Sequence, residues 1–136
     1  MEQPALYYPY NSRNRLVTRE TIERILGDHG VFEPIRDADI YKRAFVHKSY
    51  TYPEDPQVLV AECPSDSIPL RTTSNERLEF LGDGVLELIT KFYLYRRFPN
   101  ADEGFMTEKK ISIVKNEHIG KLALDLGIDK FLLLDT

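Results

Sequence analysis

Three carboxylates at helical spacing are the residues of this chain whose types and positions could carry out chemistry. Glu76, Glu79 and Asp83 occupy positions i, i+3 and i+7, so a helix would place them along one face. Like charges at this spacing repel each other by roughly 0.2–0.5 kcal/mol per pair. Such a stripe is typical of a site that a cation occupies, and carboxylate oxygens are ligands that Mg²⁺ prefers.

Glu79 and Asp83 lack a basic residue at the neighbouring positions of their own helix. The residues three and four positions away from them are acidic, apolar or uncharged. Glu87 differs, because a lysine follows four residues later in the favourable order. Glu76 is intermediate, since it also fits the last position of a capping box that begins at Thr73.

Two interpretations of the Glu79/Asp83 pair remain open from spacing alone. In the functional interpretation, both carboxylates hold one Mg²⁺, and the metal activates a water for phosphodiester hydrolysis. In the structural interpretation, a basic residue of another helix, such as Lys109 or Lys110, neutralises the pair. Acidic pairs on helices are common, so their spacing does not decide between the two.

The element that must position these carboxylates is a long central helix. The capping box predicts that it begins near Ser74, and apolar residues continue to about Arg97. Because this helix is apolar nearly all round, we expect it to lie in the middle of a bundle. Gly82 and Gly84 lie within it and predict the close approach of another backbone, from a neighbouring helix or a second subunit.

Two further helices are predicted before the central one. Thr18 fits the N-cap of a first helix that ends at Gly27, and Asp37 or Asp39 fits the start of a second. The residues before Thr18 show no periodicity and predict an extended arm.

Three segments complete the expected organisation. Residues 51–72 contain four of the eight prolines and predict a long loop, either disordered or an insertion with a specific role. Thr107 can cap a later helix or helix pair that closes at Gly127. The apolar run 131–134 should pack on something, within this chain or beyond it. No strand alternation is convincing, so the predicted fold class is all-α.

Composition and charge narrow the classes of protein. The 136 residues suffice for one domain with a core, and no run of about 18 apolar residues predicts a membrane span. Without a secretory signal pattern, and with Cys63 as the only cysteine, we expect an intracellular protein. The net charge of −4 counts against nucleic-acid binding, but residues 91–121 carry seven Lys or Arg against four Asp or Glu. An acidic site with a basic flank has this pattern, and so do ordinary solvated helices.

The carboxylate stripe belongs to a longer motif. Residues 75–86 read Asn-Glu-Arg-Leu-Glu-Phe-Leu-Gly-Asp-Gly-Val-Leu, and they resemble the signature of the ribonuclease III family over a dozen positions. Residues 47–50 resemble the family's short upstream motif. Residues 95–99 and 103–105 resemble the segment after the signature, and matches within 114–127 resemble the following helices. The resemblance covers roughly residues 20–134 and skips the proline-rich loop. That loop and the Ser/Thr-rich lead into the signature look most like ribonuclease III of large DNA viruses.

The resemblance implies an endonuclease that cleaves double-stranded RNA with Mg²⁺, for which Mn²⁺ can substitute. Glu79 and Asp83 would then be the catalytic metal ligands, with Glu76 an auxiliary acid of the RNA-facing cluster. The family dimerises through its signature helices, so that two sites in one cleft each cut one strand. The residues expected at the dimer or helix-packing surface are Phe80, Leu81, Gly82 and Gly84.

Two departures from the family pattern affect this expectation. Gly84 stands where the family usually has Ser or Ala, and no Asp-x-x-Glu, the family's second acidic pair, follows Asp83. We therefore expect residues 18–136 to be part of a catalytic domain, truncated before its second acidic helix and incomplete on its own, after an arm formed by residues 1–17. Within these 136 residues we also expect no double-stranded RNA-binding domain.

Other functions remain open at this point. A non-catalytic ribonuclease III-like module would bind RNA or dimerise, and an inhibitor-like partner would dimerise with a complete enzyme. The missing acidic pair favours such a module, whereas the unpaired Glu79 and Asp83 disfavour it. A nucleophilic set of His47, Ser49 and Tyr50 is rejected, because no acid is placed to orient the histidine.

Overall fold

The computed structural model describes residues 5–136, and the regular elements in that range are helices. In chain order they are α1 (Arg19–Asp28), α2 (Ala38–Ala44), η1 (Lys48–Tyr50), α3 (Glu76–Arg97), α4 (Glu103–Val114), α5 (Asn116–Leu126) and η2 (Asp129–Phe131), where η marks a 3₁₀-helix. β-Pairing among the described residues is limited to isolated bridges. The predicted all-α class is confirmed.

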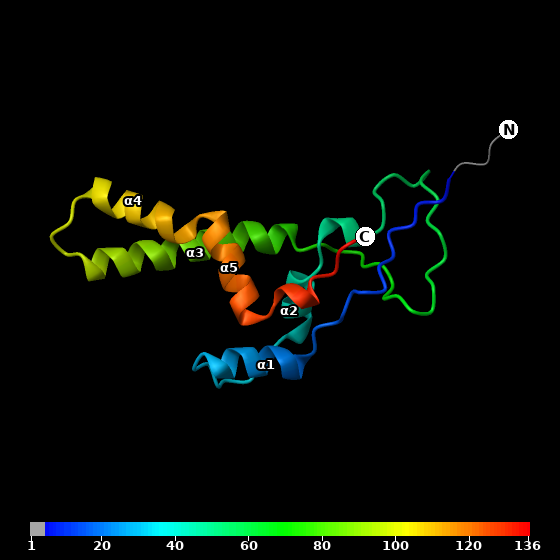
Figure 1. Cartoon of the computed structure of the whole chain (residues 1–136), viewed down its shortest axis with the longest axis horizontal. Helices are drawn as coiled ribbons and strands as arrows, with labels where there is room; N and C mark the ends of the chain where they lie inside the picture. The colour runs from blue at the N-terminus through cyan, green and yellow to red at the C-terminus, as the bar shows by residue number, and fades with distance from the viewer. Residues whose placement is uncertain (1–4) are drawn as a thin grey trace. The chain divides into compact units, whose positions relative to one another are not determined.

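The chain divides into two compact units, which are described separately. The first comprises residues 5–76 together with Lys130–Thr136, and the second comprises Arg77–Asp129. Of the helices labelled in Figure 1, the first unit contains α1 and α2. The second unit contains α4, α5 and nearly all of α3. The predicted domain bounds stay a prediction, and the first four residues of the predicted arm lie outside the described range.

Local capping fixes the starts of the first two helices. The Thr18 hydroxyl accepts a hydrogen bond from the Thr21 amide at 3.2 Å, which confirms Thr18 as the N-cap of α1. The sequence left two candidates for α2. The structure selects Asp37, whose carboxylate accepts a hydrogen bond from the Asp39 amide at 3.0 Å.

Two predicted helix boundaries are wrong. Helix α1 ends at Asp28 rather than Gly27, and α4 begins after Asp102 rather than at Thr107. The Asp102 carboxylate accepts a hydrogen bond from the Phe105 amide at 2.8 Å, so Thr107 lies inside the helix. Aspartate and threonine are both good N-caps, and the pattern alone does not choose between them.

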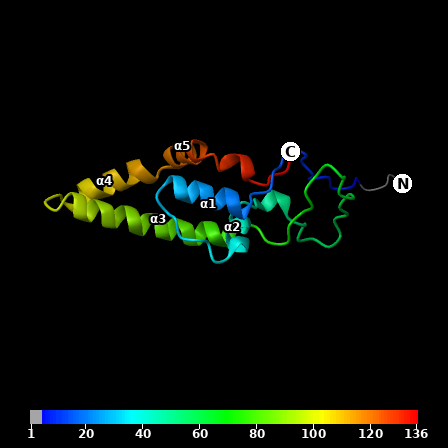
Figure 2. The same ribbon diagram turned by 90° about the horizontal axis from the view of Figure 1, so that it is seen from below.

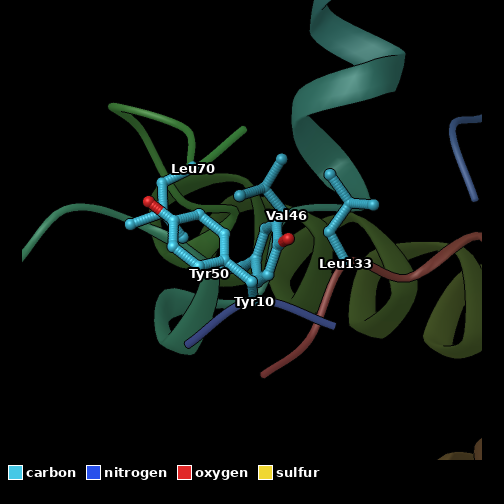
Figure 3. Close-up of a cluster of buried hydrophobic side chains, with 5 residues drawn as sticks. All are labelled: Tyr10, Val46, Tyr50, Leu70 and Leu133. Atoms are coloured by element: carbon cyan, nitrogen blue, oxygen red, sulfur yellow. The ribbon is translucent and has the colours of Figure 1, made fainter. Parts of the chain in front are cut away.

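The first unit contains a cluster of buried hydrophobic side chains, which Figure 3 shows gathered together. Its buried members are Tyr10, Val46, Tyr50, Leu70 and Leu133. The Tyr50 hydroxyl donates to the Ile68 carbonyl at 2.6 Å, and the Tyr10 hydroxyl donates to the Ala61 carbonyl at 2.8 Å. Burial also raises the pKa of Tyr10, so this hydroxyl stays a donor. Both rings are buried without leaving a hydroxyl unpaired.

The proline-rich loop 51–72 packs on this cluster. The two tyrosine hydroxyls bind its carbonyl groups, and Leu70 of the loop is buried in the cluster. Isolated bridges also pair Tyr7 with Val60 and Thr51 with Arg71. The loop is therefore ordered on this cluster rather than disordered, and its specific role stays a prediction.

The apolar run 131–134 is largely covered within the first unit. Leu133 is 3% exposed, its amide donates to the Phe45 carbonyl at 2.8 Å, and its carbonyl accepts from the His47 amide at 3.1 Å. Phe131 packs against a second cluster around Ile22. The expectation that this run packs on something is confirmed.

In the second unit, α4 and α5 contact each other, and both Figure 1 and Figure 2 show α4 returning alongside α3. Gly127 follows the end of α5 with φ 72°, the left-handed conformation that favours glycine. Its amide donates to the Leu124 carbonyl at 3.0 Å, so the predicted closure of this helix is confirmed.

Helix α3 is apolar nearly all round yet largely exposed. Its buried residues are Thr90 and Leu94, whereas Phe80 is 85% exposed and Leu88 is 68% exposed. The prediction of a bundle-centre helix is therefore wrong for residues 5–136, because none of them covers these side chains.

No helix in this range has the length and apolar character needed to cross a membrane.

Candidate functional site

Glu79 and Asp83 lie one turn apart on α3, within the second unit, and both are exposed. The helix is continuous between them, so the four-residue spacing places both carboxylates on one helical face. The structure therefore brings together the two predicted catalytic residues. Glu76 is the first residue of α3 and belongs to the first unit.

The lysines expected to neutralise this pair have other partners. Lys110 Nζ lies 3.0 Å from Glu87 Oε1, and Lys91 Nζ lies 3.2 Å from the same oxygen. Lys109 Nζ lies 5.4 Å from the centre of the Phe105 ring, in a cation–π contact. Each of these cations thus has a local contact within α3 and α4.

Glu87 is a carboxylate of α3 that lysines do neutralise, and it differs from Glu79 and Asp83 in this respect. Hydrogen bonds from Lys110 and Lys91 lower the pKa of Glu87 from its ordinary value. By contrast, no ion pair or side-chain hydrogen bond involves Glu79 or Asp83 anywhere in residues 5–136. The structural interpretation, in which a lysine of another helix neutralises the pair, is not supported.

Glu76 has a different environment from the pair. Its carboxylate lies 3.9 Å from Lys48 Nζ, and the same ammonium lies 4.0 Å from a carboxylate oxygen of Glu54 in the loop. The Glu76 amide donates to the Ser74 hydroxyl at 3.3 Å, so Ser74 provides the bond that the capping box predicted for Thr73. No local pattern indicated the contact with Lys48, because the two residues are distant in the chain.

Asn75 fixes the start of α3, a role that sequence analysis missed. Its backbone amide donates to the Val46 carbonyl at 2.8 Å, and its side-chain Nδ2 donates to the Ala44 carbonyl at 3.0 Å. These bonds attach the residue before α3 to the end of α2, within the first unit. The only signal in the sequence is its place at the start of the signature-like segment.

The donors on α3 suit a hard divalent cation as part of its ligand set. Two carboxylates open to solvent can each offer an oxygen, and Mg²⁺ keeps several waters in its sites. Among the residues that the structure describes, no group of three His, Cys, Asp or Glu is arranged to hold a metal. Glu79 and Asp83 could therefore supply at most part of a metal's ligand set, and their role as metal ligands stays a prediction.

The four residues expected at a packing surface are uncovered. Phe80 is 85% exposed and Leu81 is 63% exposed, and a Cβ at Gly82 or Gly84 would meet no atom within 4 Å. Close approach of a backbone from the described part of this chain is therefore not observed. Their role at a dimer surface stays a prediction.

His47 has a structural role at a helix end. Its Nδ1 accepts a hydrogen bond from the Ser49 amide at 3.1 Å, which caps η1, and lies 2.8 Å from the Ser49 hydroxyl. No carboxylate within residues 5–136 is hydrogen-bonded to its ring. The rejection of a nucleophilic set is consistent with this arrangement.

The chain is similar to ribonucleases over most of its length. The model of a family described as Ribonuclease-III-like matches residues 37–136, a span that contains Glu79 and Asp83. The chain is 37% identical over 98 residues to "Ribonuclease 3" of Enterococcus faecalis, covering 72% of this chain and 37% of that protein. It is 34% identical over 122 residues to "Ribonuclease 3" of Phocaeicola vulgatus, covering 88% of this chain and 35% of that protein.

A human relative matches a shorter part of the chain. The identity to "Ribonuclease 3" of Homo sapiens is 46% over 68 residues, which cover 50% of this chain and 5% of that protein. The matches thus cover little more than a third of the length of the two bacterial relatives and a small part of the human one.

Proposed function

The chain belongs to the Ribonuclease-III-like family, and from this premise we propose that it is part of a metal-dependent endoribonuclease that hydrolyses double-stranded RNA. One observation carries the proposal. Glu79 and Asp83 are exposed on adjacent turns of α3 and have no cationic partner among residues 5–136. A carboxylate pair left unneutralised in this way is available to a divalent cation.

The proposed roles follow from these environments. Glu79 and Asp83 would hold Mg²⁺, whereas Glu76, which already pairs with Lys48, would be an auxiliary acid near the RNA. When bound, Mg²⁺ stabilises the negative charge that develops on the phosphate and lowers the pKa of water. The exposure of both carboxylates leaves room for a substrate phosphate beside them.

Basic residues of the second unit would contact the RNA backbone. Lys91 and Lys110 are occupied by Glu87. Among the described residues of the 91–121 segment, Lys121 has neither an ion pair nor a cation–π contact. Three further cations have a cation–π contact but no ion pair, and these are Arg96, Arg97 and Lys109. Phosphate neutralisation by such side chains makes binding weaker as salt increases.

A homodimer is the proposed form of the protein. The exposed apolar side chains of α3 include Phe80, Leu88 and Ile89, at 85%, 68% and 60% exposure. An apolar surface of this kind is typical of a protein–protein contact, and a second copy would cover it by a symmetric contact.

The test of the catalytic role is cleavage of a long RNA duplex with Mg²⁺. Asp83→Asn keeps the side-chain shape and removes the charge, so we expect the cleavage rate to fall by roughly a hundredfold or more. Asp125→Asn is the matched control, because Asp125 is exposed on α5 and has no ion pair among residues 5–136. Measurable cleavage by the wild-type chain at a rate that Asp83→Asn leaves unchanged would contradict the proposed role.

Metal binding gives a second readout that does not depend on activity. Mn²⁺ should broaden the NMR signals of residues around Glu79 and Asp83, and this broadening should disappear in the double variant Glu79→Gln/Asp83→Asn. Broadening without cleavage would support the metal site and indicate that this chain needs further residues for hydrolysis. Duplex binding without metal binding or cleavage would instead favour a non-catalytic RNA-binding module.

A further inference from the structure

A second candidate site is a cavity of about 470 Å³ in the first unit. It is lined by side chains of α2, the residues before α1 and α3, and the C-terminal run, and neither Glu79 nor Asp83 contributes to it. Its volume falls within the roughly 300–1,000 Å³ typical of small-molecule sites. The cavity therefore shares no lining residue with the proposed metal site.

Three cations line the cavity. Lys42 and Arg43 come from the last turn of α2, and Arg71 comes from the end of the loop. Among residues 5–136, none of the three takes part in an ion pair, although the carboxylate of Asp39 also lines the cavity. The helix C-terminus accounts in part for Lys42 and Arg43, but Arg71 lies in no helix and has no such explanation.

Arg71 is anchored by its backbone. Its amide donates to the Tyr50 carbonyl at 3.0 Å, and its carbonyl accepts from the Tyr52 amide at 3.2 Å. Thr72 and Thr73 follow it in the chain and also line the cavity. A guanidinium on a fixed backbone, with hydroxyl donors nearby, is the kind of group that binds a phosphate.

The rest of the cavity wall is apolar and partly aromatic. Phe45 and Phe131 are half-buried, and Leu16 is 51% exposed. Aromatic side chains stack on nucleobases whatever the base.

We propose that this cavity binds a nucleotide, with Arg71, Lys42 and Arg43 at the phosphate and Phe45 and Phe131 against the base. The ligand is either a free nucleoside monophosphate or one nucleotide of a single-stranded RNA. Both present the same phosphate and base, and a concave site of this size suits one such unit better than it suits a membrane surface.

The test is a titration of the full chain with each probe, in which calorimetry and NMR measure binding. The probes are adenosine 5′-monophosphate, adenosine, inorganic phosphate, O-phosphoserine and an RNA hexamer. We expect adenosine 5′-monophosphate or the hexamer to shift the signals of the lining residues, with adenosine and phosphate binding more weakly. A hexamer that binds more tightly than the monophosphate would identify RNA as the source of the nucleotide.

Three variants test the residues. Arg71→Gln should weaken nucleotide binding roughly tenfold, because it removes a charge-assisted hydrogen bond. Asp39→Asn should strengthen binding, because Asp39 carries the one carboxylate among the described residues that line the cavity. Arg36→Gln is the control, since Arg36 is exposed in the first unit and does not line the cavity.

Several outcomes would overturn the proposal. These are no nucleotide binding at millimolar concentration, equal weakening by Arg36→Gln and Arg71→Gln, and equal binding of inorganic phosphate or O-phosphoserine. Circular dichroism checks that the variants remain folded. If Arg71→Gln unfolds the chain, Asp39→Asn still decides, because unchanged or weaker binding by that variant contradicts the assignment.

Discussion

At the level of single residues, neighbours decide the chemistry of each carboxylate on α3. Glu87 has the ammonium groups of Lys91 and Lys110 within 3.2 Å, and both lower its pKa. Its ion pair with Lys110 links α3 to α4. Asp83 lies one turn earlier on the same helix and has no cationic partner in the described range. The role of an acidic residue on α3 therefore depends on whether a lysine lies beside it, on α3 itself or on α4.

The ion pairs of Glu87 should make a pH-dependent contribution to stability. The folded-state pKa of Glu87 is lowered, and the ordinary pKa of a Glu carboxyl is about 4.3. The contribution is thus present above that pH and is lost as the pH falls through the folded-state pKa. We expect Glu87→Gln to lower the midpoint of thermal unfolding slightly at pH 7, and to lower it less at pH 3.

The control for this prediction is Glu108→Gln, at an exposed glutamate of α4 without an ion pair among residues 5–136. Its effect on the unfolding midpoint should not depend on pH in the same way. A difference between wild type and Glu87→Gln that stays constant from pH 7 to pH 3 would exclude the ion pairs as its source.

At the level of elements, the sequence predicts features that depend on contacts within one helical turn. Helix caps form hydrogen bonds to residues a few positions away, so local sequence patterns predict them. The caps predicted in this way are Thr18, Asp37 and Gly127. The same local logic misplaced the start of α4, because Asp102 and Thr107 are both plausible caps.

Contacts between distant residues could not be predicted in this way. The spacing of Glu79 and Asp83 was visible in the sequence, but the choice of Glu87 as the partner of Lys110 depends on the path of α4. The burial of Leu133 similarly depends on its pairing with Val46, far away in the chain. The spacing of the carboxylate pair left its function open, and only the resemblance to a family indicated metal binding.

The order of loop 51–72 should depend on Tyr50. Removing the fully buried ring by Tyr50→Ala should cost about 3–5 kcal/mol of unfolding free energy, whereas Tyr50→Phe removes a hydrogen bond worth about 0.5–1.5 kcal/mol. Urea unfolding measures both values, and limited proteolysis should cut the loop faster in Tyr50→Ala. Tyr52→Phe is the control, because Tyr52 is 53% exposed. Equal proteolysis of all four proteins would show that the loop is ordered by other contacts.

At the level of the whole molecule, the two units differ in how much core they have. The two hydrophobic clusters lie in the first unit, and the buried residues of α3 are Thr90 and Leu94. The second unit thus leaves more of its apolar surface in solvent among the described residues. A protein with such a surface gains stability by association.

Self-association should therefore occur through α3. Analytical ultracentrifugation should show a dimer of the wild-type chain, and Phe80→Glu should raise the dissociation constant by roughly tenfold or more. Leu124→Glu is the matched control, because Leu124 is 63% exposed on α5 rather than on α3. A wild-type chain that stays monomeric at high concentration, or a dimer that Phe80→Glu leaves intact, would contradict the proposed surface.

Glu79 and Asp83 share α3 with Phe80 and Leu88, which has a thermodynamic consequence. If metal binding and self-association both act on this helix with a coupling free energy between them, each changes the equilibrium of the other by the same factor. The Mg²⁺ concentration would then help to set the fraction of dimer. Protein concentration would in turn set the apparent affinity for the metal, so that dilution alone would release both the partner and the ion.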